Sequence, residues 1–156
     1  KRFALVEEAV RRASRQLPQL EILTVFHALQ TELAAWMNAA DVLVLASYSE
    51  GSPNAVKEAM SVNLPIVSVR VGDVPEMFDG VEGCHLCASS PLALAEKIVE
   101  VCSAPRRSGG RERVSGLSME RVARRLANIY RRLLGRPELD EEAPPPSSVT
   151  GLPGSA

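Results

Sequence analysis

A run of apolar residues that leads through a polar loop into a helix constrains the fold of this chain more than any other feature. Residues 41–45 read Asp-Val-Leu-Val-Leu, and nearly continuous apolar runs are typical of strands that are covered on both faces. A helix is predicted over residues 53–62, and further strands are predicted over residues 65–69 and 83–87. Strands that alternate with helices pair in parallel through right-handed crossovers. The sequence therefore predicts an α/β fold with a short parallel sheet.

The rest of the chain carries further helix and strand patterns. In chain order we expect a helix over residues 3–16 that Pro18 stops, a strand over 21–26, a helix over 31–38 capped by Thr31, short and long helices over 75–78 and 91–102, a Gly/Arg-rich connection up to Gly116, and a helix from a Ser118 cap to about Leu134. Residues 1–135 are predicted to form one domain. Residues 136–156 have too few apolar side chains to offset the entropy of ordering, so we expect a disordered Pro/Ser-rich tail.

Composition limits the class of protein. A chain of 156 residues with 46% hydrophobic residues can bury one core. The net charge of −1 and the 4% of aromatic residues argue against nucleic-acid binding through a basic field or base stacking. No apolar run approaches the roughly 20 residues that span a bilayer, and the N-terminal stretch has no signal-peptide core. We therefore expect a cytoplasmic protein whose partner is a small molecule.

The three cysteines, Cys84, Cys87 and Cys102, form an odd and small set, which indicates reduced thiols rather than a disulfide framework. Cys84 and Cys87 have a spacing that also occurs in metal sites. No second ligand pair follows them, and His27 is remote in sequence. Strand thiols are therefore favoured over a zinc site, and we expect no metal.

The loop and helix start at residues 50–58 carry the candidate ligand site. Ser52 is predicted to cap the first turn and Pro53 to occupy the first helical position. The unpaired N–H groups and the positive end of the helix dipole then favour a phosphate, and Gly51 permits a close approach of the ligand. Glu50 and Glu58 add two carboxylates, which suit vicinal hydroxyl groups because an ionised carboxylate only accepts hydrogen bonds. The pattern indicates a sugar-nucleotide site.

Several ordered motifs together carry a family resemblance. They are residues 37–45, 50–60, 64–67, 71–76 and 92–99. In this order they resemble the donor-binding half of retaining glycosyltransferases of the GT-B fold, the glycogen-synthase-like superfamily or glycosyl transferases group 1. The resemblance covers about residues 1–134 and implies a three-layer, Rossmann-like domain that is the C-terminal half of a GT-B fold.

The resemblance also implies roles for individual residues. Glu50 would contact the transferred sugar near its reacting centre, and Glu58, which follows after seven intervening residues, would hold the ribose of the nucleotide. Residues 26–29 would border the base, and Lys1 resembles the basic residue that neutralises the diphosphate. The implied set is Glu50 as the catalytic residue and Lys1, Gly51, Ser52, Pro53, Asn54, Ala55, Val56 and Glu58 as donor-binding residues.

The implied reaction is glycosyl transfer with retention from a UDP- or GDP-sugar. No cofactor and no metal are expected, because the helix N-terminus and basic side chains would neutralise the diphosphate and the chain has no Asp-x-Asp motif. The family pattern begins with a strand and an acceptor-binding domain ahead of the helix at residues 3–16. We therefore expect a fragment that lacks its first strand and its N-terminal partner domain and is inactive alone.

Two alternative functions are weighed against this one. The chain could be a non-catalytic nucleotide-binding or interaction module derived from the same fold. A sugar-nucleotide epimerase is disfavoured, because only two histidines are present. The arginines near the C-terminus are expected to form a solvated helix face, with a peripheral contact to acidic lipid as the other use.

Asp73 stands where many relatives have glycine, so no sugar contact is assigned to its loop.

Overall fold

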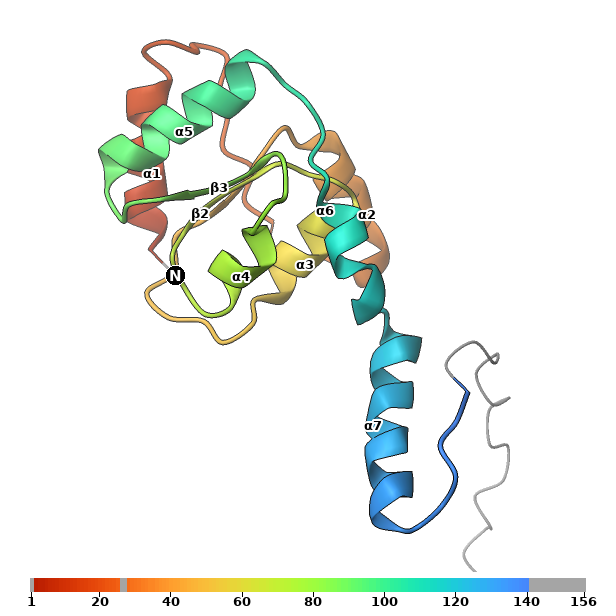
Figure 1. The fold of residues 1–156 in the computed structure, drawn as a ribbon. Coiled ribbons are helices and arrows are strands. Elements are labelled where there is room, and N and C mark those ends of the chain that lie inside the picture. Colours follow the sequence, from red (N-terminus) through yellow and green to blue (C-terminus); the bar gives the residue numbers. More distant parts are fainter. Residues whose placement is uncertain (1, 26–27, 141–156) are drawn as a thin grey trace, which may run out of the picture. The chain divides into compact units, whose positions relative to one another are not determined.

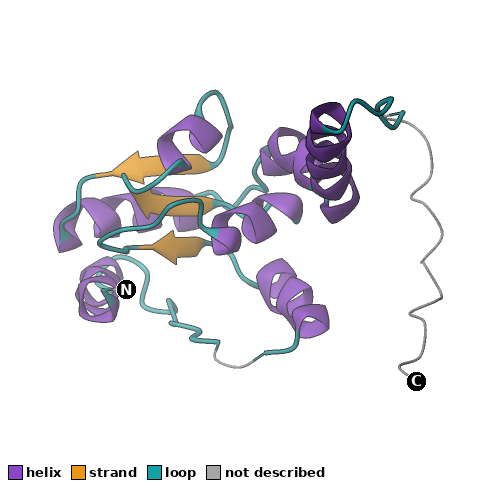
Figure 2. Ribbon diagram, turned by 90° about the horizontal axis from the view of Figure 1, so that it is seen from below, coloured by secondary structure: helices purple, strands orange, loops and turns teal. Residues whose placement is uncertain are grey.

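The computed structural model describes residues 2–25 and 28–140. The chain forms two compact units, and the boundary between them along the sequence falls between Ser115 and Gly116. Figure 1 shows the elements in sequence colours. The first unit contains three parallel strands, β1 (Leu43–Leu45), β2 (Ile66–Val69) and β3 (Cys84–Cys87), in the order β1-β2-β3. The strand arrows point the same way in Figure 2. The predicted α/β fold with a short parallel sheet is confirmed.

Helices lie on both sides of this sheet. Helices α1 (Phe3–Ala13) and α5 (Pro91–Ser103) pack against each other on one side, while α3 (Asn54–Ser61) and α4 (Val74–Phe78) lie on the other (Figure 1). Helix α6 (Gly110–Val114) packs on α3, and α2 (Gln30–Ala39) precedes β1. The layers are those of a Rossmann-like domain.

The core lies between these layers. Every residue of β2 is buried, as expected for a central strand with helices on both faces. Val56 and Met60 of α3 meet it from one side, and Leu94 and Ile98 of α5 are buried with it in the same cluster. The apolar spacing of the helices and the continuous apolar run of β2 thus serve one core.

Three local predictions are wrong. Residues 21–25 form no strand, and Phe26 lies outside the described residues. No strand of the described chain pairs with this segment, and β-branched composition alone does not hold a strand. Thr31 is not a cap: α2 begins after Leu29, whose N–H donates to the Glu32 carboxylate at 3.2 Å. The connection before Gly116 contains α6, and Gly110 of this helix lies so close to α3 that an added Cβ would be 2.8 Å from the Met60 Cα.

The second unit contains α7 (Met119–Leu133). The Ser118 hydroxyl accepts a hydrogen bond from the Arg121 N–H at 3.3 Å, so the predicted cap is confirmed. The helix ends at Leu133, and the turn that follows it contains Gly135, which has a φ of +62°. The Arg136 N–H donates to the Arg131 carbonyl at 2.8 Å and completes this turn. Residues 141–156 lie outside the described residues, so the disorder expected there stays a prediction. Within the described part of the chain, no helix is both long and apolar enough to cross a membrane.

Candidate functional site

The predicted site residues gather where the three parallel strands end. The loop of residues 46–53 follows β1, residues 70–73 follow β2, and residues 88–90 follow β3. Ligands of open parallel sheets bind beyond the carboxyl ends of the strands. The topology therefore brings the loop before α3 to the edge of the sheet that is suited to a ligand.

Glu50 is half-buried in the loop after β1. Its Oε1 accepts a hydrogen bond of 2.6 Å from the hydroxyl of Ser47, a side chain that is only 1% exposed. Hydrogen bonds from a hydroxyl to a carboxylate are short and strong, so this contact orients the carboxylate. Glu58 is also half-buried, in the body of α3. Glu50, Gly51 and Ser52 thus lie in the loop just ahead of α3, and Glu58 lies within the helix.

The start of α3 differs from the prediction. The helix begins at Asn54 with Pro53 as the residue before it, and no side chain of the described residues caps it. Ser52 does not cap the helix: Pro53 holds the cap position, and the Ser52 hydroxyl donates to the Asp73 carboxylate. The consequence is that the first N–H groups of α3 carry no side-chain cap, which leaves the helix N-terminus suited to an anion.

The loops after β1 and β2 are locked together by backbone contacts. Gly72 has a φ of +50°, and a Cβ at this position would lie 2.0 Å from the Gly51 carbonyl oxygen. The Asp73 N–H donates to the same oxygen at 3.0 Å. Asp73 Oδ1 is buried and has no hydrogen-bond partner among the described residues. Asp73, to which the sequence assigned no contact, therefore belongs to the site through Gly51 and Ser52.

Arg2 is a site residue that sequence reasoning missed. Its Nε donates to the Ala46 carbonyl at 3.0 Å and its Nη2 to the Ser47 carbonyl at 3.1 Å. It also donates to the Ser89 hydroxyl, and its guanidinium lies 4.7 Å from the centre of the Tyr48 ring. Lys1, the basic residue predicted to face a diphosphate, lies outside the described residues. The sequence signal for Arg2 was the basic pair that it forms with Lys1 directly before a helix.

The other predicted donor-binding residues differ in burial. Asn54 is exposed, Ala55 is half-buried and Pro53 is buried. The Val56 side chain is 0% exposed and belongs to the core, so only its backbone could face a ligand. Of the segment predicted to border a base, Ala28 and Leu29 are described, and residues 26 and 27 lie outside the described residues.

The cysteines are not arranged as metal ligands. Cys84 and Cys87 are three positions apart on β3, so their side chains point to opposite faces of the sheet. Burial raises the pKa of the Cys84 thiol to about 11 and also raises the pKa values of Cys87 and Cys102. The thiols are therefore neutral near pH 7. Residues 2–25 and 28–140 contain no cluster of three or more His, Cys, Asp or Glu side chains that could hold a metal ion.

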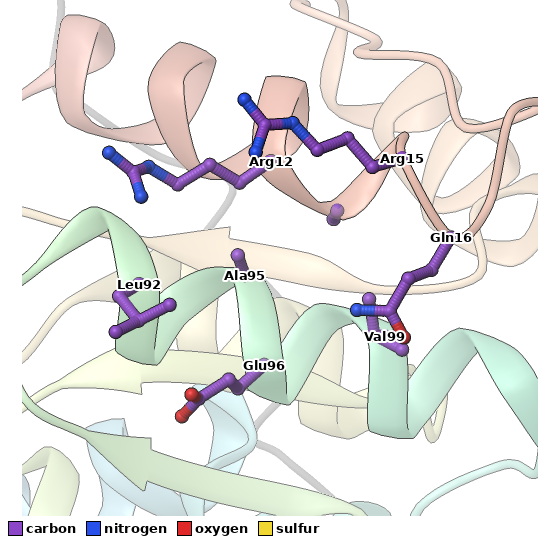
Figure 3. Close-up of a pocket in the computed structure, with 8 residues that line it drawn as sticks. Arg12, Arg15, Gln16, Leu92, Ala95, Glu96 and Val99 are labelled. Atoms are coloured by element: carbon purple, nitrogen blue, oxygen red, sulfur yellow. The ribbon is translucent and has the colours of Figure 1, made fainter.

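A pocket of about 190 Å³ lies apart from these loops, between α1 and α5 (Figure 3). Its lining includes Arg12, Gln16, Leu92 and Glu96. None of the predicted site residues lines it. This pocket is therefore a gap between two packed helices and does not coincide with the predicted site.

Comparison with known proteins places residues 5–104 in the family model described as "Glycosyl transferases group 1". A D-inositol 3-phosphate glycosyltransferase of Streptomyces griseus is 38% identical over 49% of this chain and 16% of its own length. The D-inositol 3-phosphate glycosyltransferase 2 of Catenulispora acidiphila is 35% identical over 50% of this chain and 18% of its own length. The Vi polysaccharide biosynthesis protein VipC/TviE of Salmonella typhi is 33% identical over 64% of this chain. The aligned region is 19% of that protein, so the chain matches less than a fifth of each of these relatives. No solved structure matches the chain.

Proposed function

The chain belongs to the glycosyl transferases of group 1, and from this premise we propose that it forms the donor-binding part of a retaining glycosyltransferase that uses a nucleotide-diphosphate sugar. One observation carries the proposal: Glu50 and the uncapped N-terminus of α3 occur together at the carboxyl ends of a parallel sheet, inside the matched region. Relatives named as glycosyltransferases support the same class of reaction.

Each part of the proposed site has a separate task. The N–H groups at the start of α3 stabilise the negative charge that grows on the leaving diphosphate. Glu50 accepts hydrogen bonds from hydroxyl groups of the transferred sugar, and Glu58 accepts them from the ribose. Lys1 adds positive charge near the diphosphate. No cofactor or metal is part of this proposal, and the base of the donor is uracil or guanine.

The acceptor-binding part of the enzyme is proposed to lie in a second, N-terminal domain. The matched regions cover less than a fifth of the relatives, so there is ample sequence in those proteins for such a domain. The chain alone would then bind a donor and transfer nothing. The three unpaired thiols fit a cytoplasmic location, which is also a proposal. A peripheral contact between the arginines of α7 and acidic lipid stays part of the proposal as well.

Calorimetric titration with UDP, GDP, UDP-glucose and GDP-mannose tests the donor site. We expect one nucleotide class to bind the chain. Glu50→Gln should weaken binding of the nucleotide sugar by about ten-fold and leave binding of the free nucleotide unchanged, because only the sugar meets Glu50. Glu58→Gln should weaken binding of both the nucleotide sugar and the free nucleotide. Glu82→Gln is the matched control, because Glu82 precedes β3 and thus lies toward the amino ends of the strands.

The outcomes separate the proposal from the alternative. If neither UDP nor GDP binds at millimolar concentration, the donor site is not present in this chain. If nucleotides bind and both glutamine variants bind them as the unchanged chain does, the chain is better described as a nucleotide-binding or interaction module. Transfer of a sugar by the chain alone would contradict the proposed need for a second domain.

A further inference from the structure

The guanidinium of Arg2 binds the loop that carries Glu50. It stands directly before α1, which is anchored on α5 through the buried residues Ala9 and Ala13. From this base, Nε and Nη2 reach the consecutive carbonyls of Ala46 and Ser47 at 3.0 and 3.1 Å. The planar fork of arginine suits two neighbouring acceptors, which a lysine ammonium cannot match. Arg2 therefore fixes the direction in which the chain leaves β1.

Two further contacts hold Arg2 itself in place. The hydroxyl of Ser89, in the loop after β3, accepts a hydrogen bond from its guanidinium. The ring of Tyr48 lies against the guanidinium, although 79% of the Tyr48 side chain is exposed. A cation that stacks on an aromatic face and bonds three oxygen acceptors has little freedom left. Arg2 thus joins α1 to the loops that follow β1 and β3.

Ser47 connects Arg2 to the carboxylate of Glu50. Its carbonyl oxygen is held by Arg2, and its hydroxyl donates to Glu50 Oε1 at 2.6 Å. The Ser47 side chain is 1% exposed, so its hydroxyl is confined by its surroundings. A shift of the Ser47 backbone would move the hydroxyl and, with it, the direction of the Glu50 carboxylate. The contacts form one path from Arg2 through Ser47 to Glu50.

We propose that Arg2 and Ser47 are positioning residues that aim the Glu50 carboxylate at the transferred sugar, Arg2 acting through the backbone of Ser47. The inference rests on the proposed function, because it assigns Glu50 to the sugar. It adds a prediction of its own: Arg2 and Ser47 govern how much affinity the sugar adds to the nucleotide, and not the affinity for the nucleotide. Arg2, in spite of its charge, does not serve as a phosphate ligand.

A double-mutant cycle on the whole chain tests the path. The dissociation constants of UDP and UDP-glucose, or of GDP and GDP-mannose if guanine nucleotides are the ones that bind, are measured for Ser47→Ala, Arg2→Gln, Glu50→Gln and the two double variants with Glu50→Gln. The readout is the ratio of the constant for the free nucleotide to that for the nucleotide sugar. We expect Ser47→Ala and Arg2→Gln to lower this ratio about three- to ten-fold, with the constant for the free nucleotide changed less than two-fold.

The Glu50→Gln background decides between positioning and general support. If Ser47 and Arg2 act through Glu50, their substitution lowers the ratio no further once Glu50 is glutamine. An equal fall in both backgrounds, or a parallel loss of affinity for free nucleotide, would overturn the inference and leave the donor site in place. Absence of any nucleotide binding would overturn the donor site itself, and the inference with it.

Matched variants guard against trivial effects. Arg11→Gln removes an exposed arginine of α1, whose partner is Glu8, and should leave the ratio unchanged. Arg2→Lys keeps the charge and loses the fork, so it should resemble Arg2→Gln. If Arg2→Lys instead restores the full ratio, charge rather than geometry is the cause and the positioning role is wrong. Circular dichroism and the thermal midpoint identify any variant that fails to fold.

Discussion

Helices α1 and α7 have the same kind of sequence pattern and end in different surroundings. Both alternate apolar and arginine-rich faces at helical spacing. In α1 the apolar face is covered: Ala9 and Ala13 are buried, and the helix packs along α5. In α7 the apolar seam stays open, with Leu126 51% and Ile129 53% exposed. Amphipathic spacing therefore predicts that a helix forms and which face is apolar, but not what covers that face.

The two helices are consequently stabilised by different interactions. Tertiary burial stabilises α1, as it does most helices in proteins. In α7, local contacts replace it: the Ser118 cap, the turn at Gly135, and a pair of hydrogen bonds between Asn128 and the backbone of Leu139, at 2.7 and 3.1 Å. The first unit should therefore respond to changes in its core, and the second to changes at its ends.

Truncation of a leucine in each unit should give the largest difference. Leu94 of α5 is 0% exposed, and Leu94→Ala should lower the free energy of unfolding by about 2–5 kcal/mol through lost burial and a cavity. Leu126→Ala removes the same atoms from an open face of α7 and should cost less than about 1 kcal/mol. Urea unfolding followed by circular dichroism measures the first change, and hydrogen exchange of the α7 amides measures the second.

Equal costs at the two leucines would contradict the comparison. In particular, a loss of about 2 kcal/mol or more at Leu126 would mean that the seam of α7 is covered in solution. Repeating the urea experiment at several protein concentrations would then show whether a second copy of the chain covers it, because association makes stability depend on concentration.

Two glycines of positive φ give the next largest contrast. Alanine in the left-handed region costs about 1–2 kcal/mol wherever it occurs, and this strain applies to both Gly72→Ala and Gly135→Ala. At Gly135 an added Cβ meets no atom within 4 Å, whereas at Gly72 it would lie 2.0 Å from the Gly51 carbonyl oxygen. Gly72→Ala must therefore also displace the loop before α3, and it should weaken nucleotide binding as well as stability. Thermal unfolding and nucleotide titration measure the two effects.

The Gly72 experiment has a clear contrary result. If Gly72→Ala costs no more stability than Gly135→Ala and leaves nucleotide binding unchanged, the close approach of the two loops does not exist in solution. The Ser52 and Asp73 contact would then lose its support, since the same loop approach brings these side chains together.

The sheet could be predicted from the sequence because its signals are local. The apolar runs that became β1 and β2 and the Ser118 cap each depend on neighbouring residues. The failures depend on distant ones. Ser52 was expected to cap α3 because serine does so locally, yet its partner Asp73 is 21 positions away. Arg2 and Ala46 are 44 positions apart, and no spacing rule connects them.

The same distinction explains the rest of the site. Glu50 and the start of α3 could be located from the sequence, because a strand, a glycine and a helix start follow one another in the chain. The orientation of Glu50 could not be predicted in full. Its contact with Ser47 is local, but the hydrogen bond that holds the Ser47 carbonyl comes from Arg2, directly before α1. A strand at residues 21–26 was predicted from composition, and its described part, residues 21–25, forms none, because strands need a partner that composition does not supply.

Removal of a helix cap from each unit should give the smallest and most local contrast. Ser90 caps α5 by accepting from the Ala93 N–H at 3.2 Å, and Ser118 caps α7 by accepting from the Arg121 N–H at 3.3 Å. Each serine-to-alanine change should cost about 0.5–2 kcal/mol. Core contacts hold α5 in place after its cap is lost. The amides of its first turn should therefore exchange faster while the rest of the helix stays formed. In α7 the cap is one of few restraints, so Ser118→Ala should speed exchange along the whole helix, and exchange confined to its first turn would show that α7 is held by more than its ends.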